Sequence, residues 1–411
     1  MIHISIRTFL KPFQLSRNFT ALWTGQILSH LGDAALWVVL PLCAYSLSQS
    51  TLDMGWIMGL LMLPQVILLP FAGMIVDRVS RTKLLIITEL VRCILVGILT
   101  CLSLLQYLSI TTLSIFVVMY GMMNALFQPA YMALRAQVFT EDIRNAALSL
   151  TQISQELARL VAPVLGGAMV GLISVGAGFG TVAVLLFISI VVLTFVRVDK
   201  PTSKNDTSPV LHNFRHELLG GFIEIRKHPW IWITILAFTI INIGFAGITT
   251  ILLPWLMKVH LHLSDLSYGL VSSAGAIGAI IAALFYGRKS THRRGYVAYI
   301  SVLINSVALA CLAFVSTTVG IMMLIAIANG AIMVFALIWE GSLLELVPEE
   351  SYGRVASLDL FGSWTLLPIG NVMSGWLASW LGGVEAIWLE GTLMFCVALG
   401  VLFIPAIRRF N

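Results

Sequence analysis

Twelve long apolar stretches divide this 411-residue chain, and they constrain its fold more than any other feature. Each is about 20 residues or longer, the length at which an α-helix crosses the hydrocarbon core of a bilayer. The sequence therefore predicts an all-α membrane protein with twelve transmembrane helices. The expected ranges are 19–47, 52–76, 84–104, 111–134, 147–173, 177–197, 230–256, 267–286, 296–316, 319–341, 355–380 and 385–406.

The basic residues are distributed unevenly among the connections. All but three of the 24 Lys and Arg residues lie in the termini or in alternate connections, starting with the one between the second and third helices. Such an excess marks the cytoplasmic side. We therefore expect a multi-pass protein of the inner (plasma) membrane with both termini in the cytoplasm. The exceptions are Lys258, in a connection of the opposite set, and Arg92 and Arg159, inside predicted helices.

The composition agrees with this fold class. Hydrophobic residues make up 59% of the chain and charged residues only 10%, far from the averages of soluble proteins. The net charge of +5 follows from the charge asymmetry, and no dense basic run indicates a nucleic-acid partner. We expect no cofactor and no metal, since the cysteines lie in apolar stretches without metal-binding or redox spacing. They are Cys43, Cys93, Cys101, Cys311 and Cys396.

The longest polar interruption lies in the middle of the chain. It predicts a six-helix bundle over 1–198, a cytoplasmic linker with an amphipathic helix over 199–229, and a second six-helix bundle over 230–411. Acidic pairs recur in order: Glu141-Asp142 precedes the fifth helix and Glu349-Glu350 the eleventh. This repetition indicates two pseudo-symmetric bundles with a transport site near the bilayer midplane. We expect a monomer in contact with membrane lipids.

The sharpest local motif lies between the second and third helices and consists of Gly73, Asp77, Arg78, Arg81 and Lys83. Gly73 allows two helices to approach closely. Asp77 stands near the C-terminal end of a helix, where the dipole disfavours a carboxylate, so it needs a compensating partner. A cytoplasmic turn that follows the charge asymmetry accounts for the basic residues but not for Asp77. The motif therefore predicts a conformational gate.

These residues resemble the loop signature of the major facilitator superfamily, G-x-x-x-D-R-x-[GS]-R-x-K. Other segments resemble its prokaryotic macrolide and siderophore efflux branch. They are Leu31-Gly32-Asp33, Glu89-Leu90-Val91-Arg92, Phe127-Gln128-Pro129-Ala130, residues 158–167 with Pro163, Gly166 and Gly167, and Arg226-Lys227-His228-Pro229. The resemblance implies the major facilitator fold, packing of Asp77 against the start of the eleventh helix, and a central cavity lined by the first, fourth, seventh and tenth helices.

The first helix carries Gln26, His30, Asp33 and Trp37 at steps of four, three and four, which places them on one face. A buried carboxyl group in a cavity can take up and release a proton. Asp33 is therefore expected to carry a proton or to contact the substrate, with His30 as a partner and Glu340 as the next candidate. The alternative is a structural role, in which Asp33 only hydrogen-bonds across helices or caps a bend.

The four helices that the resemblance places around the cavity each carry a stripe of amide and aromatic side chains. Such a lining suits an amphipathic organic substrate better than a sugar or an inorganic anion, although the same spacing is typical of ordinary helix packing. The expected lining residues are Gln26, Trp37, Asn124, Gln128, Asn242, Phe245, Asn329 and Met333.

Two acid-before-base pairs, Glu89/Arg92 and Glu156/Arg159, stand at i, i+3 inside the third and fifth helices, a spacing that lets the charges meet. Both helices belong to one half, so a cluster of four charges can form. We expect a structural or gating network rather than direct substrate binding. We assign no function to Glu390, near the outer end of the twelfth helix.

The chain lacks a phosphate-binding loop of the G-x-x-x-x-G-K-[ST] type and the common motifs of hydrolases and metalloproteases. We therefore expect no enzyme and no ATP-driven pump. The leading expectation is a secondary transporter that exports a hydrophobic or amphipathic small molecule, such as a drug or siderophore, in exchange for protons. A lysophospholipid or other lipid transporter and an uptake permease are alternatives, and a sensor without transport fits less well.

Overall fold

The computed structural model describes residues 6–140, 142–197, 222–286, 293–348, 355, 358–359, 361–363 and 365–410. Side chains are described for these residues except 6–10, 69–78, 136, 144–145, 149 and 344. Within these ranges the chain forms helices and no strands. The first half contains α1 (Ile6–Leu15), α2 (Arg17–Ser48), α3 (Thr51–Arg78), α4 (Arg81–Leu104), α5 (Ile110–Val138), α6 (Arg144–Leu172) and α7 (Val175–Leu193). The second contains α9 (Pro229–Gly247), η1 (Ile248–Leu252), α10 (Leu253–Trp255), η2 (Leu256–His260), α11 (Asp265–Tyr286), α12 (Arg294–Cys311), η3 (Leu312–Phe314), α13 (Thr318–Leu346), α15 (Leu367–Leu381), α16 (Gly383–Leu402) and α17 (Pro405–Arg408).

Ten helices in the described ranges are long and apolar enough to cross a membrane. The remaining two predicted spans correspond to α6 and α15. The polar first half of α6 lowers its hydropathy, and α15 is described over only 15 residues. Within the described ranges the prediction of an all-helical, multi-pass membrane protein is therefore confirmed. Most helix ends differ from the predicted ones by a few residues, whereas α15 begins at Leu367 and the eleventh span was predicted to begin at 355.

Several helices begin where a side-chain oxygen accepts a free backbone N–H group. Ser16 accepts from Phe19 at the start of α2 (3.0 Å), and Ser174 accepts from Ala177 at the start of α7 (3.1 Å). Thr317 does the same for Gly320 at the start of α13 (3.2 Å). Ser and Thr are preferred at this position because the first turn of a helix has no internal partner for its donors.

The seventh predicted span, 230–256, is a helix of mixed geometry. It continues to His260, and two π-helical segments, η1 and η2, flank a short α-helical turn that contains Pro254. Proline has no backbone N–H group, and π-helical turns are frequent where the regular hydrogen-bond ladder is interrupted.

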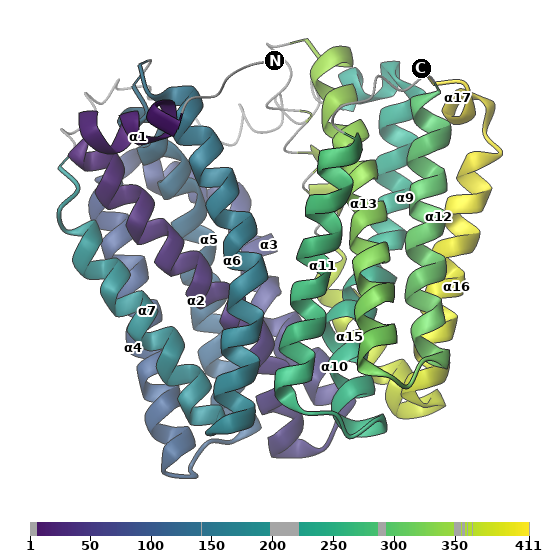
Figure 1. Cartoon of the computed structure of the whole chain (residues 1–411), viewed down its shortest axis with the longest axis horizontal. Coiled ribbons are helices and arrows are strands. Elements are labelled where there is room, and N and C mark those ends of the chain that lie inside the picture. Colours follow the sequence, from purple (N-terminus) through teal and green to yellow (C-terminus); the bar gives the residue numbers. More distant parts are fainter. Residues whose placement is uncertain are drawn as a thin grey trace. The chain divides into compact units, whose positions relative to one another are not determined.

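The chain divides into two compact units, 1–201 with 264–273, and 202–263 with 274–411. In the first unit, α2 packs against α6 and α7, while α3 and α4 pack against α5, so that these helices lie side by side (Figure 1). In the second unit, α12 packs against α13 and α16, and α9 packs against α15 and α16. In this division the first turns of α11 group with the helices of the first half. A glycine allows α11 to approach α6 closely, because a Cβ atom on Gly269 of α11 would overlap the carbonyl oxygen of Pro163 in α6.

A glycine also sets the distance between α3 and α5. A Cβ atom on Gly121 would overlap the backbone carbonyl oxygen of Leu61. We expect Gly121→Ala to destabilise the protein by about 1–3 kcal/mol, because backbone cannot move aside as a side chain can. The matched control is Gly97→Ala in α4, where a Cβ atom would meet nothing within 4 Å. Thermal unfolding in detergent measures both variants, and equal melting temperatures would contradict the prediction.

Candidate functional site

The centre of the first unit contains a buried ion pair between α2 and α4. Arg92 Nη1 lies 2.9 Å from Asp33 Oδ1 and 3.1 Å from Asp33 Oδ2. The hydroxyl group of Tyr120, on α5, donates to Asp33 Oδ1. The side chain of Arg92 is fully buried, and that of Asp33 is 15% exposed. Asp33 therefore joins three helices and remains the more accessible member of the pair.

Arg92 also binds a second carboxylate. Its Nη2 atom donates to Glu89 Oε2, one turn earlier on α4, and to Ser29 Oγ at 2.8 Å. Ser29 in turn lies 3.3 Å from Glu89 Oε2. The side chain of Glu89 is fully buried. Since Ser29 and Asp33 are four residues apart on α2, one helical face presents both to Arg92.

Aromatic rings complete the surroundings of the Arg92 guanidinium group. Its central carbon lies 4.3 Å from the ring centre of Phe127 and 5.4 Å from that of Tyr120, both on α5. These distances are within the range of cation–π attraction. The guanidinium group therefore lies between two carboxyl groups and two aromatic rings.

The charges of this cluster do not balance. Arg92 supplies one positive charge, while Asp33 and Glu89 supply two negative charges when both are ionised. An uncompensated charge in a buried site is costly. One proton shared by the two carboxyl groups would make the cluster neutral.

His30 lies one turn from Asp33 and belongs to a separate set of polar contacts. Its Nε2 atom is 2.7 Å from Gln26 Nε2 and 3.1 Å from Gln155 Nε2 on α6. The structure thus brings Gln26, His30 and Gln155 together across α2 and α6. Sequence reasoning missed Gln155, although it is the neighbour of Glu156, which was singled out.

The two acid-before-base pairs lie in different environments. Glu156 and Arg159 do meet, with 3.3 Å between Oε1 and Nη1, but the Arg159 side chain is 67% exposed. Among the described residues, no ion pair joins them to Glu89 and Arg92. The cluster of four that the sequence allowed is therefore replaced by one of Asp33, Glu89 and Arg92, since the Arg92 side chain is enclosed whereas that of Arg159 is exposed.

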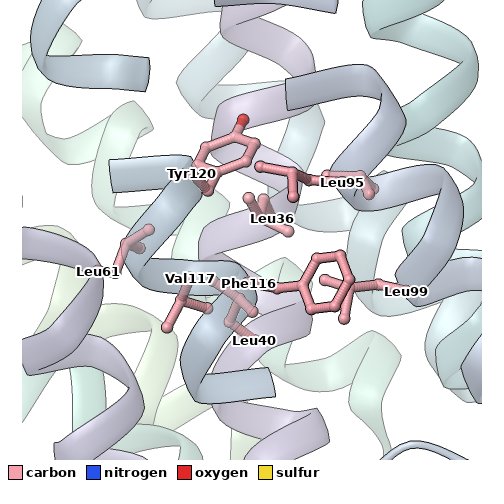
Figure 2. A pocket seen from close by; sticks show the side chains of 9 residues that line it. Leu36, Leu40, Leu61, Leu95, Leu99, Phe116, Val117 and Tyr120 are labelled. Atoms are coloured by element: carbon pink, nitrogen blue, oxygen red, sulfur yellow. The ribbon is translucent and has the colours of Figure 1, made fainter. Parts of the chain in front are cut away.

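A small apolar cavity lies next to the cluster. Figure 2 shows the ring of Tyr120 at its edge, with the hydroxyl group directed away from the leucine side chains. That hydroxyl group is the one that binds Asp33. The ring of Tyr120 therefore lies between the apolar cavity and the charged site. Its lining comes from α2, α3, α4 and α5: Leu36, Leu40, Leu61, Leu95, Val96, Leu99, Phe116, Val117 and Tyr120.

The expected lining residues of the first unit are partly accessible. Trp37, Asn124 and Gln128 are half-buried, and Gln26 is buried. The amide oxygen of Asn124 is buried and has no hydrogen-bond partner among the described residues. Sequence reasoning did not anticipate this free acceptor inside α5.

Two of the expected lining residues of the second unit form hydrogen bonds with backbone carbonyl oxygens of the same unit. Asn242 donates to the carbonyl oxygen of Ser363 (3.1 Å), and Asn329 donates to that of Ile325 in its own helix (3.0 Å). Phe245 and Met333 are half-buried, and Glu340 is exposed on α13. A further acid, Asp359, accepts from the indole of Trp339 and was not anticipated.

The gating motif is described only in part. Gly73 lies in α3. The side chains of Asp77 and Arg78 lie outside the described residues, and so does the packing expected of Asp77. Arg81 Nη1 donates to the carbonyl oxygen of Ala133 on α5 (3.3 Å), and Lys83 is exposed. Arg81 therefore links the start of α4 to the end of α5.

The motif of the fifth predicted helix lies inside α6. Pro163 is within the helix, and a Cβ atom on Gly166 would lie 3.0 Å from the carbonyl oxygen of Ala35 on α2. A Cβ atom on Gly167 would lie 2.5 Å from the carbonyl oxygen of Asp265, at the start of α11. The two glycines therefore allow α6 to contact two helices at backbone distance.

Ionisable side chains buried between membrane helices are typical of transport proteins. The fold and this site together define a polytopic membrane transporter. Residues 22–252 and 239–410 match the family described as the Major Facilitator Superfamily. The chain belongs to this superfamily, and it is accordingly a transporter rather than an enzyme.

Individual relatives match over nearly their whole length. The uncharacterized MFS-type transporter YfiS of Bacillus subtilis (strain 168) is 24% identical, with 95% of this chain and 94% of YfiS covered. Macrolide efflux protein A of Streptococcus pyogenes is 21% identical, with 96% and 97% covered. A bacterial homologue of the iron transporter ferroportin, solved in an inward-facing state, has a similar fold (TM-score 0.71, 15% identity, 93% and 98% covered).

Proposed function

We propose that this transporter exports a hydrophobic or amphipathic small molecule, such as a drug or a siderophore-like compound, in exchange for protons. The observation that carries the proposal is the buried cluster of Asp33, Glu89 and Arg92, which contains two carboxyl groups and one guanidinium group. Such a cluster is neutral with one bound proton and negative without it. It can therefore bind and release one proton in a transport cycle.

Asp33 is the better candidate for the proton-carrying group. Its side chain is 15% exposed while that of Glu89 is fully buried, so water reaches Asp33 more easily. Protonation of Asp33 would weaken its ion pair with Arg92 and its hydrogen bond with Tyr120. Since these contacts join α2 to α4 and α5, proton binding would change how firmly the three helices are held together. This is a physical route from protonation to a conformational step.

The direction of transport and the substrate class have separate support. Macrolide efflux protein A carries export of a macrolide in its name, and it matches this chain over 96% of the residues. Aromatic residues and amides in the predicted lining suit an amphipathic organic molecule. Lipid transport, with a lysophospholipid as the substrate, is the second candidate, and uptake is the third.

Substrate-stimulated proton flux in proteoliposomes tests the proposal. With the wild-type protein and an imposed pH gradient, we expect a macrolide or a siderophore to accelerate proton flux and to accumulate against its gradient. Lysophospholipids form the comparison set. Proton flux driven only by lysophospholipids would favour the second candidate, and flux insensitive to every compound would refute proton-coupled export.

We further propose that Gly73, Asp77, Arg78, Arg81 and Lys83 form a gate on the cytoplasmic side and that the chain acts as a monomer. The contact of Arg81 with α5 supports a role in holding neighbouring helices together at this end of the first unit. The bundles over 1–198 and 230–411 are the two parts that we propose move relative to each other during transport.

The orientation in the membrane is predicted from the charge asymmetry. Cysteines introduced at Ser203 and at Ser264 should react with a membrane-impermeant thiol reagent from opposite faces, Ser203 from the cytoplasm and Ser264 from outside. Ser264 is exposed, just before α11. Labelling of both from the same face would contradict the predicted topology.

A further inference from the structure

The second unit contains a buried acid that the proposed function does not use. Glu390 lies on α16, about two turns after its start at Gly383, and it is 2% exposed. Neither oxygen of its carboxyl group has a hydrogen-bond partner among the described residues. An ionised carboxylate in such a position would lose its hydration without compensation.

Among the described residues, the elements packed against α16 place no cation at hydrogen-bond distance from Glu390. Three of the elements packed against α16, namely α9, η1 and α15, contain no Asp, Glu, Lys, Arg or His. In α12, Ala310 touches α16 at Gly391, and Arg294 is 16 residues away, about 24 Å along the helix. The element η3, also packed against α16, has no titratable side chain. The other titratable groups of the packed elements and of α16 itself are Tyr296, Tyr299 and Cys311 of α12, Arg408 of α17, and Glu385 and Cys396 of α16.

Ser374, on α15, is the polar side chain that shares this position with Glu390. Both face Gly247: a Cβ atom there would overlap the Ser374 hydroxyl oxygen and would lie 2.7 Å from Glu390 Oε2. The Ser374 hydroxyl group donates its single proton to the carbonyl oxygen of Gly370 (2.9 Å). Toward Glu390 it can therefore only accept a hydrogen bond. A protonated Glu390 can donate to it, whereas an ionised Glu390 finds no donor.

The place where these groups meet is also a change in helix geometry. Gly247 is the last residue of α9, and the π-helical segment η1 begins at the next residue. A π-helical turn inside a longer helix is often found at a functional site. The absence of a side chain on Gly247 lets Ser374 and Glu390 reach the backbone at this junction.

We propose that Glu390 is a proton-binding site of the second unit, a buried carboxylic acid that donates to Ser374 beside the junction of α9 and η1. It is distinct from the cluster of Asp33, Glu89 and Arg92, which belongs to the first unit. Release of this proton requires water to reach Glu390, and hence a separation of α16 from α9 and α15. Protonation of Glu390 thus favours close packing of these three helices.

Infrared spectroscopy of the purified protein in lipid tests the proposal directly. At neutral pH a free glutamate side chain is ionised, so the carbonyl stretching band of a protonated carboxylic acid identifies a buried acid. We expect Glu390→Gln to remove one component of this band and Glu385→Gln to leave the band unchanged. Glu385 is the matched control, because it is an exposed acid on the same helix. An identical band in the wild type and Glu390→Gln would overturn the proposal.

A second variant keeps the test informative if Glu390→Gln does not fold. Ser374→Ala removes the acceptor but keeps the acid, so we expect the same band component to shift rather than vanish. An unshifted band would overturn the assignment of Ser374 as the acceptor and with it the proposed site. The component should persist in Asp33→Asn, which separates this proposal from the transport mechanism.

A monovalent cation is the competing occupant of an unpaired carboxylate. Melting temperatures in sodium chloride and in choline chloride of equal ionic strength distinguish the two. We expect no difference between the salts for the wild type. Stabilisation by sodium that Glu390→Gln abolishes would show a cation site and overturn the proton-binding proposal.

Discussion

Replacing Arg92 with methionine is expected to destabilise the protein by about 3–5 kcal/mol, the cost of leaving a buried charge without its partner. Methionine keeps much of the side-chain length but removes the guanidinium group. Glu89 and Asp33 would then face each other without a cation, and Ser29 would lose the donor 2.8 Å away. A large fall in melting temperature in detergent, or failure to accumulate in the membrane, is the expected result.

The chain supplies a matched control for this prediction. Arg159 has the same i, i+3 arrangement with an acid, but its side chain is 67% exposed and its distance to Glu156 is 3.3 Å. Exposed ion pairs contribute about 0–1 kcal/mol. Arg159→Met should therefore change the melting temperature little. Similar falls in melting temperature for Arg92→Met and Arg159→Met would mean that burial does not determine how much these ion pairs stabilise the protein.

Asp33→Asn is expected to abolish uphill transport driven by a pH gradient while the protein remains folded. The amide removes one negative charge, so Arg92 and Glu89 balance each other and the cluster resembles its protonated state. Substrate binding and downhill exchange should therefore persist. The decisive measurement is accumulation of substrate by this variant across an imposed pH gradient, with the melting temperature determined on the same preparation.

Glu89→Gln separates the roles of the two carboxyl groups. It also leaves the cluster neutral, but it retains a titratable group at the more accessible position. If Asp33 carries the proton, transport should depend on Asp33 far more than on Glu89. Accumulation by Asp33→Asn with the pH dependence of the wild type would assign Asp33 a hydrogen-bonding role and make Glu340, exposed on α13, the next residue to test.

Sequence patterns identified several residues of the charged cluster, but they did not predict which of these residues form ion pairs with each other. The steps of four, three and four residues placed Gln26, His30, Asp33 and Trp37 on one face. The i, i+3 spacing brought Glu89 and Arg92 together. Helix periodicity is local, so these neighbours follow from the chain alone. The ion pair between Asp33 and Arg92 spans 59 positions in the sequence. No local pattern specifies such a contact.

The difference between the two acid-before-base pairs also depends on contacts between distant parts of the chain. Glu89/Arg92 and Glu156/Arg159 look alike in the sequence, yet one arginine is enclosed and the other is exposed. The difference depends on which face of each helix meets its neighbours. Ser29 was overlooked because a single serine in an apolar stretch carries no signal until a charged partner from another helix is placed beside it.

The sequence alone predicts a multi-pass helical membrane protein and most of the ends of its described helices. These properties follow from the length of apolar runs, the local chemistry of caps and the energetic cost of exposing backbone groups to lipid. The tertiary structure decided which charges lie together. It placed one guanidinium group between two carboxyl groups in the first unit, and it left Glu390 in the second unit without a cation among the described residues. Helix rotation and packing set these contacts, and they depend on side chains far apart in the chain.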